Sequence, residues 1–250
     1  MNLLVDIGNT RLKWTLSQRL GHTSQALVRT ADMSHQLELA WGNIPPPQWI
    51  VATSVAGAAA EQDVRQWVQR RWPVTRVHFV VAAAAGWGVK NSYREPARLG
   101  SDRWAALIAA RHLTQGPACV VDCGTAATID ALNAAGEFVG GVIFPGIALA
   151  RQSLRVGAAG ISEIEGDDTS CFGRTTADAV AAGTFYGLLG AVERIVTELG
   201  AGLGKDMQVL LTGGDGPRLA PYLQGRIAYP IQSVPDLVLQ GLARIAESLA

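Results

Sequence analysis

Two short segments of the chain have the residue types needed to bind phosphate groups. Each places an acid at the end of an apolar run and follows it with glycine and small polar residues: VDIGNT at 5–10 and VDCGTA at 121–126. Glycine lets the backbone approach a ligand closely, and the N–H groups and hydroxyls of such a turn donate hydrogen bonds to phosphate oxygens. Asp6 and Asp122 would repel a bare phosphate, so they fit this chemistry chiefly beside a metal ion or its waters.

A single turn of this kind also occurs in ordinary hairpins that bind no ligand. This chain has two, and a strand-like run ending in TGG at 212–214 follows them. Candidate donors are Asn9 and Thr10 in the first turn and Thr125 and Thr128 in the second. Two matched turns facing each other would clamp a polyphosphate, so the pair favours nucleotide binding over two unrelated hairpins.

A P-loop is excluded as the nucleotide site. The segment GAGLGKD at 200–206 contains Gly204 and Lys205, but it lacks the upstream glycine and the Ser or Thr that must follow the lysine. It also follows a predicted helix, whereas a P-loop follows a strand.

The elements that must position the turns alternate between strand and helix. Apolar and alternating runs predict strands at 2–6, 12–16, 49–53, 76–81 and 137–146, and a strand at 208–216 that runs into a glycine turn. Helical spacing predicts helices at 60–71, from 101 to near 116, from about 147, at about 176–199, and from about 235 to the end. This alternation indicates the α/β class.

The two acid-glycine turns sit in similar surroundings, which indicates a weak internal repeat. In both, an apolar run leads into Val-Asp-x-Gly, and an alternating strand follows. The repeat predicts two domains of like build, at residues 1–117 and 118–250.

The amino-acid composition argues against some classes of binding partner. The 250 residues include 21 basic and 21 acidic side chains, so no net charge favours nucleic acid or an anionic membrane surface. The chain has no uninterrupted apolar run near the length of a membrane span and no signal-peptide pattern at its start. Three cysteines are too few for a disulfide framework, so we expect a reduced, cytoplasmic setting without nucleic-acid or membrane partners.

The stretch KNSYREPARLGSDRWAAL at 90–107 has two interpretations. In the structural one, Ser101 caps a helix, Asp102 complements the helix dipole and Arg103 pairs with a surface acid. In the functional one, the stretch and the two turns together resemble the type III pantothenate kinases, within the superfamily of sugar kinases, Hsp70 and actin. The matching motifs are D-x-G-N-T-x-x-K at 6–13, Y-x-x-P-x-x-L-G-x-D-R at 93–103, D-x-G-T-A at 122–126, G-G-x-I-x-P-G at 140–146 and a glycine-led T-T at 175–176.

This sequence departs from the family pattern at two positions. Ser101 stands where alanine is frequent, and Ala127 stands where threonine is frequent in the second turn. Both changes are small, and at most they remove one hydroxyl donor from the phosphate turn.

The resemblance implies two ribonuclease-H-like (actin-like ATPase) domains with mixed sheets flanked by helices. It implies transfer of the γ-phosphoryl group of ATP to the primary hydroxyl of pantothenate, which gives 4'-phosphopantothenate in the first step of coenzyme A biosynthesis. It also implies Mg²⁺, a monovalent cation (K⁺ or NH₄⁺), and a homodimer with the substrate pocket at the subunit contact.

The resemblance also implies a role for each matched residue. Asp102 would be the general base that accepts the proton of the attacking hydroxyl. Asp6 would lie near Mg²⁺, through water, and Asp122 near the monovalent cation. The implied ATP-binding residues are Asp6, Ile7, Gly8, Asn9, Thr10, Arg11, Leu12, Lys13 and Thr125. The implied pantothenate-binding residues are Tyr93, Gly100, Ser101, Asp102, Arg103 and Thr176.

Two other functions stay open at this point. Another kinase or phosphatase of the superfamily, acting on a sugar or an acetate-like substrate, would keep both turns but would not need residues 93–103. A non-enzymatic role as an accessory factor for transcription is the second alternative. The zero net charge and the lack of a basic stripe or helix-turn-helix pattern argue against direct DNA contact.

Overall fold

The computed structural model describes residues 1–20, 24–30 and 32–249. The chain forms two compact units: residues 1–113, 136–138 and 236–250 make the first, and residues 114–135 and 139–235 make the second. The division into domains at 1–117 and 118–250 stays a prediction. The compact units differ from it mainly at the C-terminal end, because residues 236–250 belong to the first unit.

The first unit is built on a five-stranded mixed sheet with the strand order β3-β2-β1-β4-β5. β1 and β2 form an antiparallel hairpin around the first acid-glycine turn, while β4 runs parallel to β1 and β5 parallel to β4. The strands are β1 (Asn2–Ile7), β2 (Arg11–Leu16), β3 (Gln25–Val28), β4 (Trp49–Ser54) and β5 (Arg76–Phe79).

One face of this sheet carries the core of the unit. Successive side chains of a strand point to opposite faces, so residues 3, 5 and 7 of β1 join this core beneath α1 (Met33–Trp41) and α2 (Ala58–Arg71). Trp41, Trp67 and Trp72 pack together within it, with ring centroids 4.8 to 6.2 Å apart. Large aromatic rings give this small unit much of its buried apolar area.

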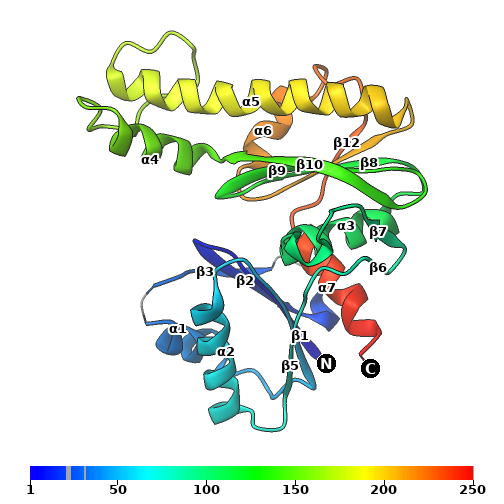
Figure 1. Cartoon of the computed structure of the whole chain (residues 1–250). Helices are drawn as coiled ribbons and strands as arrows, with labels where there is room; N and C mark the ends of the chain where they lie inside the picture. Colours follow the sequence, from blue (N-terminus) through cyan, green and yellow to red (C-terminus); the bar gives the residue numbers. More distant parts are fainter. Residues whose placement is uncertain (21–23, 31, 250) are drawn as a thin grey trace. The chain divides into compact units, whose positions relative to one another are not determined.

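The opposite face carries Leu4 and Asp6 and is covered by α3 (Ser101–Leu113) and α7 (Leu237–Glu247), which lie side by side in Figure 1. Gly241 of α7 packs on the backbone of Ala105 in α3, where a Cβ atom at position 241 would overlap the Ala105 carbonyl group. A glycine at this contact therefore lets the two helices approach closely. The C-terminal helix thus supports the helix that carries Asp102.

Shorter elements complete the first unit. They are η1 (Ser17–Arg19), β6 (Ala85–Gly86), β7 (Val89–Asn91) and η2 (Pro96–Arg98). β7 pairs with Glu137 and Phe138, the first residues of β10.

The second unit repeats the strand order of the first. Its strands follow the order β12-β11-β8-β9-β10, with an antiparallel β8-β9 hairpin, β11 parallel to β8, and β12 parallel to β11. The strands are β8 (Ala118–Cys123), β9 (Ala126–Leu132), β10 (Glu137–Pro145), β11 (Gln208–Thr212) and β12 (Ile231–Ser233). The hairpin and its two parallel neighbours match β1, β2, β4 and β5, so the internal repeat is confirmed.

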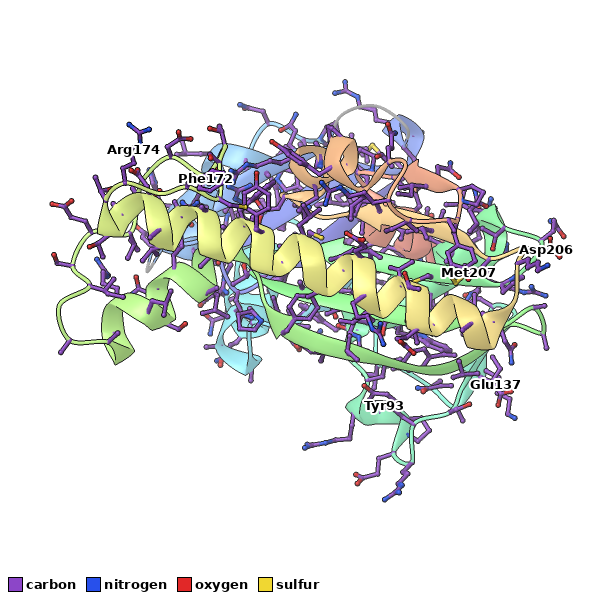
Figure 2. The ribbon with its side chains drawn as sticks, turned by 90° about the horizontal axis from the view of Figure 1, so that it is seen from above. Tyr93, Glu137, Phe172, Arg174, Asp206 and Met207 are labelled. Carbon is purple, nitrogen blue, oxygen red and sulfur yellow. The ribbon has the colours of Figure 1, made fainter. Side chains whose placement is uncertain are left out.

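Three helices belong to the second unit: α4 (Ile147–Gly157), α5 (Thr176–Leu203) and α6 (Gly216–Leu223). α5 lies along the sheet, with Phe172 and Arg174 at one end and Asp206 and Met207 at the other (Figure 2). Cys119 and Cys123 of β8 face its buried side and lie in the same core. Burial raises the pKa of both thiols to about 12, so they act as packing residues.

By length and composition alone, α5 is apolar enough to cross a membrane. Its most apolar window has a mean hydropathy of 1.3, and 44% of that window is buried inside the protein. The helix contributes Phe185, Leu189 and Val192 to the core over β8 and β9. We therefore interpret α5 as the core helix of its unit.

Most predicted elements are confirmed with small changes in their bounds. The first hairpin, β4, α2, α3, β10, α4, α5, β11 and α7 all lie where the sequence predicts them, although β5 ends at Phe79 rather than residue 81. The sequence analysis missed β3, α1, β6, β7, α6 and β12. Several of these are too short to carry a hydrophobic period, and β3 is mostly exposed.

Candidate active site

Asp6 lies at the carboxyl end of β1, on the face covered by α3 and α7. The register places it between Lys13 of β2 and Thr53 of β4, and the Thr53 hydroxyl donates a hydrogen bond to its Oδ1 atom (2.9 Å). Burial, and then the nearby Asp102 carboxylate, raise the pKa of Asp6 to about 6. Thr53 and Lys13 oppose this shift. Two acids held this close in a partly buried place favour a cation between or beside them.

The first acid-glycine turn directly follows β1 and connects it to β2. Gly8 N–H donates to the Arg11 carbonyl (2.9 Å) and closes the hairpin, and a Cβ atom at Gly8 would lie only 3.1 Å from that oxygen. Asn9 and Thr10 are exposed at the tip. Ile7 and Leu12 are fully buried, and their side chains lie in the core of the unit rather than at the surface of the turn.

The first turn of α3 carries Asp102 next to Gly100. A Cβ atom at Gly100 would lie 2.6 Å from Asp102 Oδ1, so the carboxylate occupies the space that a side chain at position 100 would fill. Asp102 Oδ1 also accepts a hydrogen bond from the Arg103 N–H (2.7 Å). Burial raises the pKa of Asp102, although this bond and the Arg103 charge oppose the shift. A carboxylate with a raised pKa is suited to accept a proton near neutral pH.

Ser101 does not use its hydroxyl as the structural interpretation expects. Ser101 Oγ accepts a hydrogen bond from the Ser54 N–H (3.0 Å) and donates to the Ser54 carbonyl (3.2 Å). Ser54 follows Thr53, the hydrogen-bond partner of Asp6. The serine therefore ties the start of α3 to the end of β4, close to Asp6.

Arg103 is only 7% exposed, so it is not a surface side chain. Its Nη1 atom donates to the Tyr93 hydroxyl (2.9 Å), and its guanidinium carbon lies 5.7 Å from the ring centroids of both Tyr93 and Phe138. The Tyr93 N–H in turn donates to Asn91 Oδ1 (3.0 Å). This packing fixes a planar cation in the same unit as Asp102, and such a fork suits a carboxylate or a phosphoryl group.

The second unit assembles three glycine turns at the carboxyl end of β8. Gly146 packs on the Gly124–Thr125 backbone and donates its N–H to the Thr125 carbonyl (3.0 Å). Gly213, with φ +89°, packs on Asp122 and Cys123, and a Cβ atom there would lie 2.5 Å from Asp122 Oδ1. Only glycine fits the approaches at positions 146 and 213, which explains the last glycine of the G-G-x-I-x-P-G motif and the first glycine of the TGG motif.

The departure at Ala127 removes no phosphate donor. Ala127 pairs with Cys123 across the hairpin and is fully buried in the core beneath α5. A hydroxyl at this position would point into that core.

Thr176, the first residue of α5, is exposed at the edge of an apolar groove of about 550 Å³. The groove is lined by the end of β10, α4, Ile161 and the first three turns of α5, and it includes Pro145, the neighbour of Gly146. Arg151, which is 8% exposed, binds Glu165 (2.9 Å) and Asp168 (2.8 Å) in the segment before α5. These ion pairs hold that segment against α4.

A family model for type III pantothenate kinases matches residues 2–198. A type III pantothenate kinase of Azoarcus sp. (strain BH72) is 42% identical over 248 residues, which cover 98% of this chain and 90% of that protein. The chain belongs to the type III pantothenate kinase family. Its fold resembles that of a conserved Campylobacter jejuni protein described as a Baf family transcriptional activator (TM-score 0.61, 21% identity, 99% of this chain and 98% of that one).

A second solved structure extends the fold comparison. A protein of Sinorhizobium meliloti described as a 2-dehydro-3-deoxygalactonokinase has a TM-score of 0.58 at 15% identity, covering all of this chain and 99% of that one. With the two mixed sheets flanked by helices, these likenesses confirm the predicted fold class, that of the sugar kinases and actin.

The structure adds a residue pair that the sequence analysis missed. Thr53 stands beside Asp6 in the β1-β4 register, and Thr212 stands beside Asp122 in the β8-β11 register. Each threonine lies at or just before the last residue of an apolar strand and precedes a small residue, in WIVATS and QVLLTGG. This shared ending is a signal in the sequence that would have found Thr53.

Each unit therefore brings together part of the predicted site. The first unit gathers the turn at 6–13 with residues 100–103 and Tyr93. The second gathers Asp122 and Thr125 with the two further glycine turns, and Thr176 lies at its own groove. The functional roles of these residues stay predictions.

Proposed function

We propose that this kinase transfers the γ-phosphoryl group of ATP to the primary hydroxyl of pantothenate, in the first step of coenzyme A synthesis. The family supports the reaction class. The observation that carries the assignment of residues is the pairing in the first unit of Asp6, at the end of β1, with Asp102, at the start of α3. Each carboxylate has a raised pKa, and Asp102 contributes to the shift at Asp6.

Asp102 would accept the proton of the pantothenate hydroxyl as the bond to phosphorus forms. Its raised pKa brings it nearer to the operating pH, where general bases are most effective. Arg103 is locked by Tyr93 and Phe138, so it can bind the pantothenate carboxylate or the transferring group without losing side-chain freedom at that moment. Ser101 and Gly100 place these two side chains.

The turns at 6–13 and 122–125 would bind the phosphate groups of ATP through backbone N–H groups and the hydroxyls of Thr10 and Thr125. Mg²⁺, when bound with ATP, neutralises charge on the phosphate oxygens. Asp6 is suited to be the residue that contacts Mg²⁺, because its carboxylate is partly buried beside a second acid, Asp102. Among the described residues, no group of three or more His, Cys, Asp or Glu side chains forms a closed metal site. ATP oxygens and water would therefore supply the other ligands.

Asp122 would hold a monovalent cation, K⁺ or NH₄⁺, at the end of β8. Its Oδ1 atom lies against the Gly213 turn, where the backbone approaches closely. A cation there would supply positive charge that the lysine of a P-loop supplies in other kinases. This chain has no such lysine.

A homodimer is supported by the apolar surface around Thr176. Beside the groove, β10, α4 and the segment before α5 expose large apolar side chains, among them Ile143 at 60% and Phe172 at 87%. Exposed apolar area of this kind marks an interaction surface. A second copy would cover it and bring Thr176 to a shared pocket. Pantothenate and ATP would then be the small-molecule partners of a cytoplasmic enzyme.

The decisive experiment is a coupled ADP-release assay with pantothenate, ATP, Mg²⁺ and K⁺, omitting each in turn. We expect phosphorylated pantothenate by mass spectrometry and a strong loss of rate on each omission. A sugar or acetate replaces pantothenate in the control reaction. Turnover of the control substrate without turnover of pantothenate would assign the chain to another reaction of the superfamily.

A further inference from the structure

Arg29, the residue after β3, folds back onto the first phosphate turn. Its Nη1 atom donates hydrogen bonds to the Gly8 carbonyl (3.0 Å) and the Asn9 carbonyl (3.0 Å). Its backbone N–H donates to the Thr10 carbonyl (2.9 Å). One residue therefore binds three consecutive carbonyl oxygens of the turn.

These contacts fix the direction of the peptide groups. In a trans peptide the N–H points opposite to the C=O, and the described chain has no cis peptide bonds. With the Gly8 and Asn9 carbonyls held at the guanidinium, the N–H groups of Asn9 and Thr10 point away from it. Two successive N–H groups on one side of a turn form a concave site for an anion.

The positive charge of Arg29 also favours this orientation of the two peptide groups. A cation at the carbonyl oxygens stabilises the negative ends of both peptide dipoles and leaves the positive ends on the opposite side of the turn. Among the described residues, both hydrogen bonds of the guanidinium go to the turn, and its buried Nε atom has no partner there. The side chain is thus committed to the turn and not to an ion pair elsewhere.

We propose that Arg29 is a positioning residue for nucleotide binding, which orients the Asn9 and Thr10 N–H groups toward the phosphates of ATP. The proposal rests on the proposed function only in taking ATP as the ligand. Arg29 acts through the turn, so its removal should weaken binding of the phosphate groups and leave adenosine and pantothenate recognition intact.

The test compares Arg29→Met, which keeps the aliphatic stem, with Arg29→Lys, which keeps the charge. Calorimetry with MgADP and with adenosine reports on the phosphate and nucleoside parts separately. We expect Arg29→Met to weaken MgADP binding about ten-fold or more and adenosine binding less than two-fold, with Arg29→Lys between it and the wild type. In steady-state assays the KM for ATP should rise while the KM for pantothenate stays within two-fold. Arg76→Met, an exposed arginine of β5 in the same sheet, is the matched control for the loss of one charge.

Wild-type affinity for MgADP in a folded Arg29→Met protein would overturn the proposal. So would an equal loss of MgADP and adenosine binding, because that result indicates general disruption of the unit. If Arg29→Met fails to fold, Arg29→Lys decides alone: ADP-selective weakening supports the proposal, and unchanged binding overturns it. Failure of the proposed function is distinguishable, because a wild type that binds MgADP but does not phosphorylate pantothenate leaves the binding comparison valid.

Discussion

Replacing Asp6 by asparagine should stabilise the ligand-free protein at neutral and alkaline pH. The pKa of Asp6 is 3.8 in the unfolded chain and about 6 in the folded one. Between these values the folded state binds more protons than the unfolded state, so stability falls as the pH rises through this window. The wild type therefore carries the full cost of the buried charge above about pH 7 and none of it below about pH 4.

The magnitude follows from the size of the shift. A rise from 3.8 to about 6 corresponds, at about 1.4 kcal/mol per unit, to roughly 3 kcal/mol. Asparagine keeps an oxygen for the Thr53 hydroxyl and removes the charge. We expect Asp6→Asn to be more stable than the wild type by up to about 3 kcal/mol at pH 8, and equally stable at pH 4.

Tryptophan fluorescence is a suitable probe, because all seven tryptophans lie in the first unit, between residues 14 and 104. Urea unfolding curves from pH 4 to 8 in EDTA give the free energy of unfolding at each pH. Asp63→Asn, at an exposed position of α2, is the matched control and should show no such trend. A difference between Asp6→Asn and wild type that does not change with pH, or lower stability of the variant at pH 8, would refute the reasoning. Kinase activity of the variant should also fall steeply if Asp6 contacts Mg²⁺ as we propose.

Three further predictions concern single residues. Asp102→Asn should lower kcat by about 10²-fold or more while MgADP binding, measured by calorimetry, stays near wild type; near-normal turnover would remove Asp102 from the base role. Ser101→Ala should lower the free energy of unfolding by about 1–2 kcal/mol, because both hydrogen bonds to Ser54 are lost, and should also lower kcat; an unchanged kcat would show that this tie does not place Asp102. Asp122→Ala should abolish the activation by K⁺ or NH₄⁺, and equal wild-type rates in sodium-only buffer would contradict a monovalent cation site.

The α/β class, the two acid-glycine turns and the helix that begins at Ser101 can all be predicted from the sequence. These features are local: period-two alternation defines the strands, and Asp-x-Gly at a strand end defines each turn. The internal repeat is also visible in the sequence, because both hairpins use the same order of residue types. The site residues proposed within the motif at 93–103 came from its resemblance to the type III pantothenate kinases.

The side chains that meet in the site are set by how distant segments of the chain pair. Asp6 lies beside Thr53 because β4 pairs with β1 in parallel, and strand pairing between distant segments leaves no period in either one. Ser101 bonds to Ser54 rather than capping its helix, and Arg29 reaches the first turn from an exposed strand whose pattern predicts nothing. The C-terminal helix joins the first unit because its apolar face packs on α3 and β1. Local residue types fix the shape of each element, whereas burial of apolar area and hydrogen-bond pairing across the chain fix the partners.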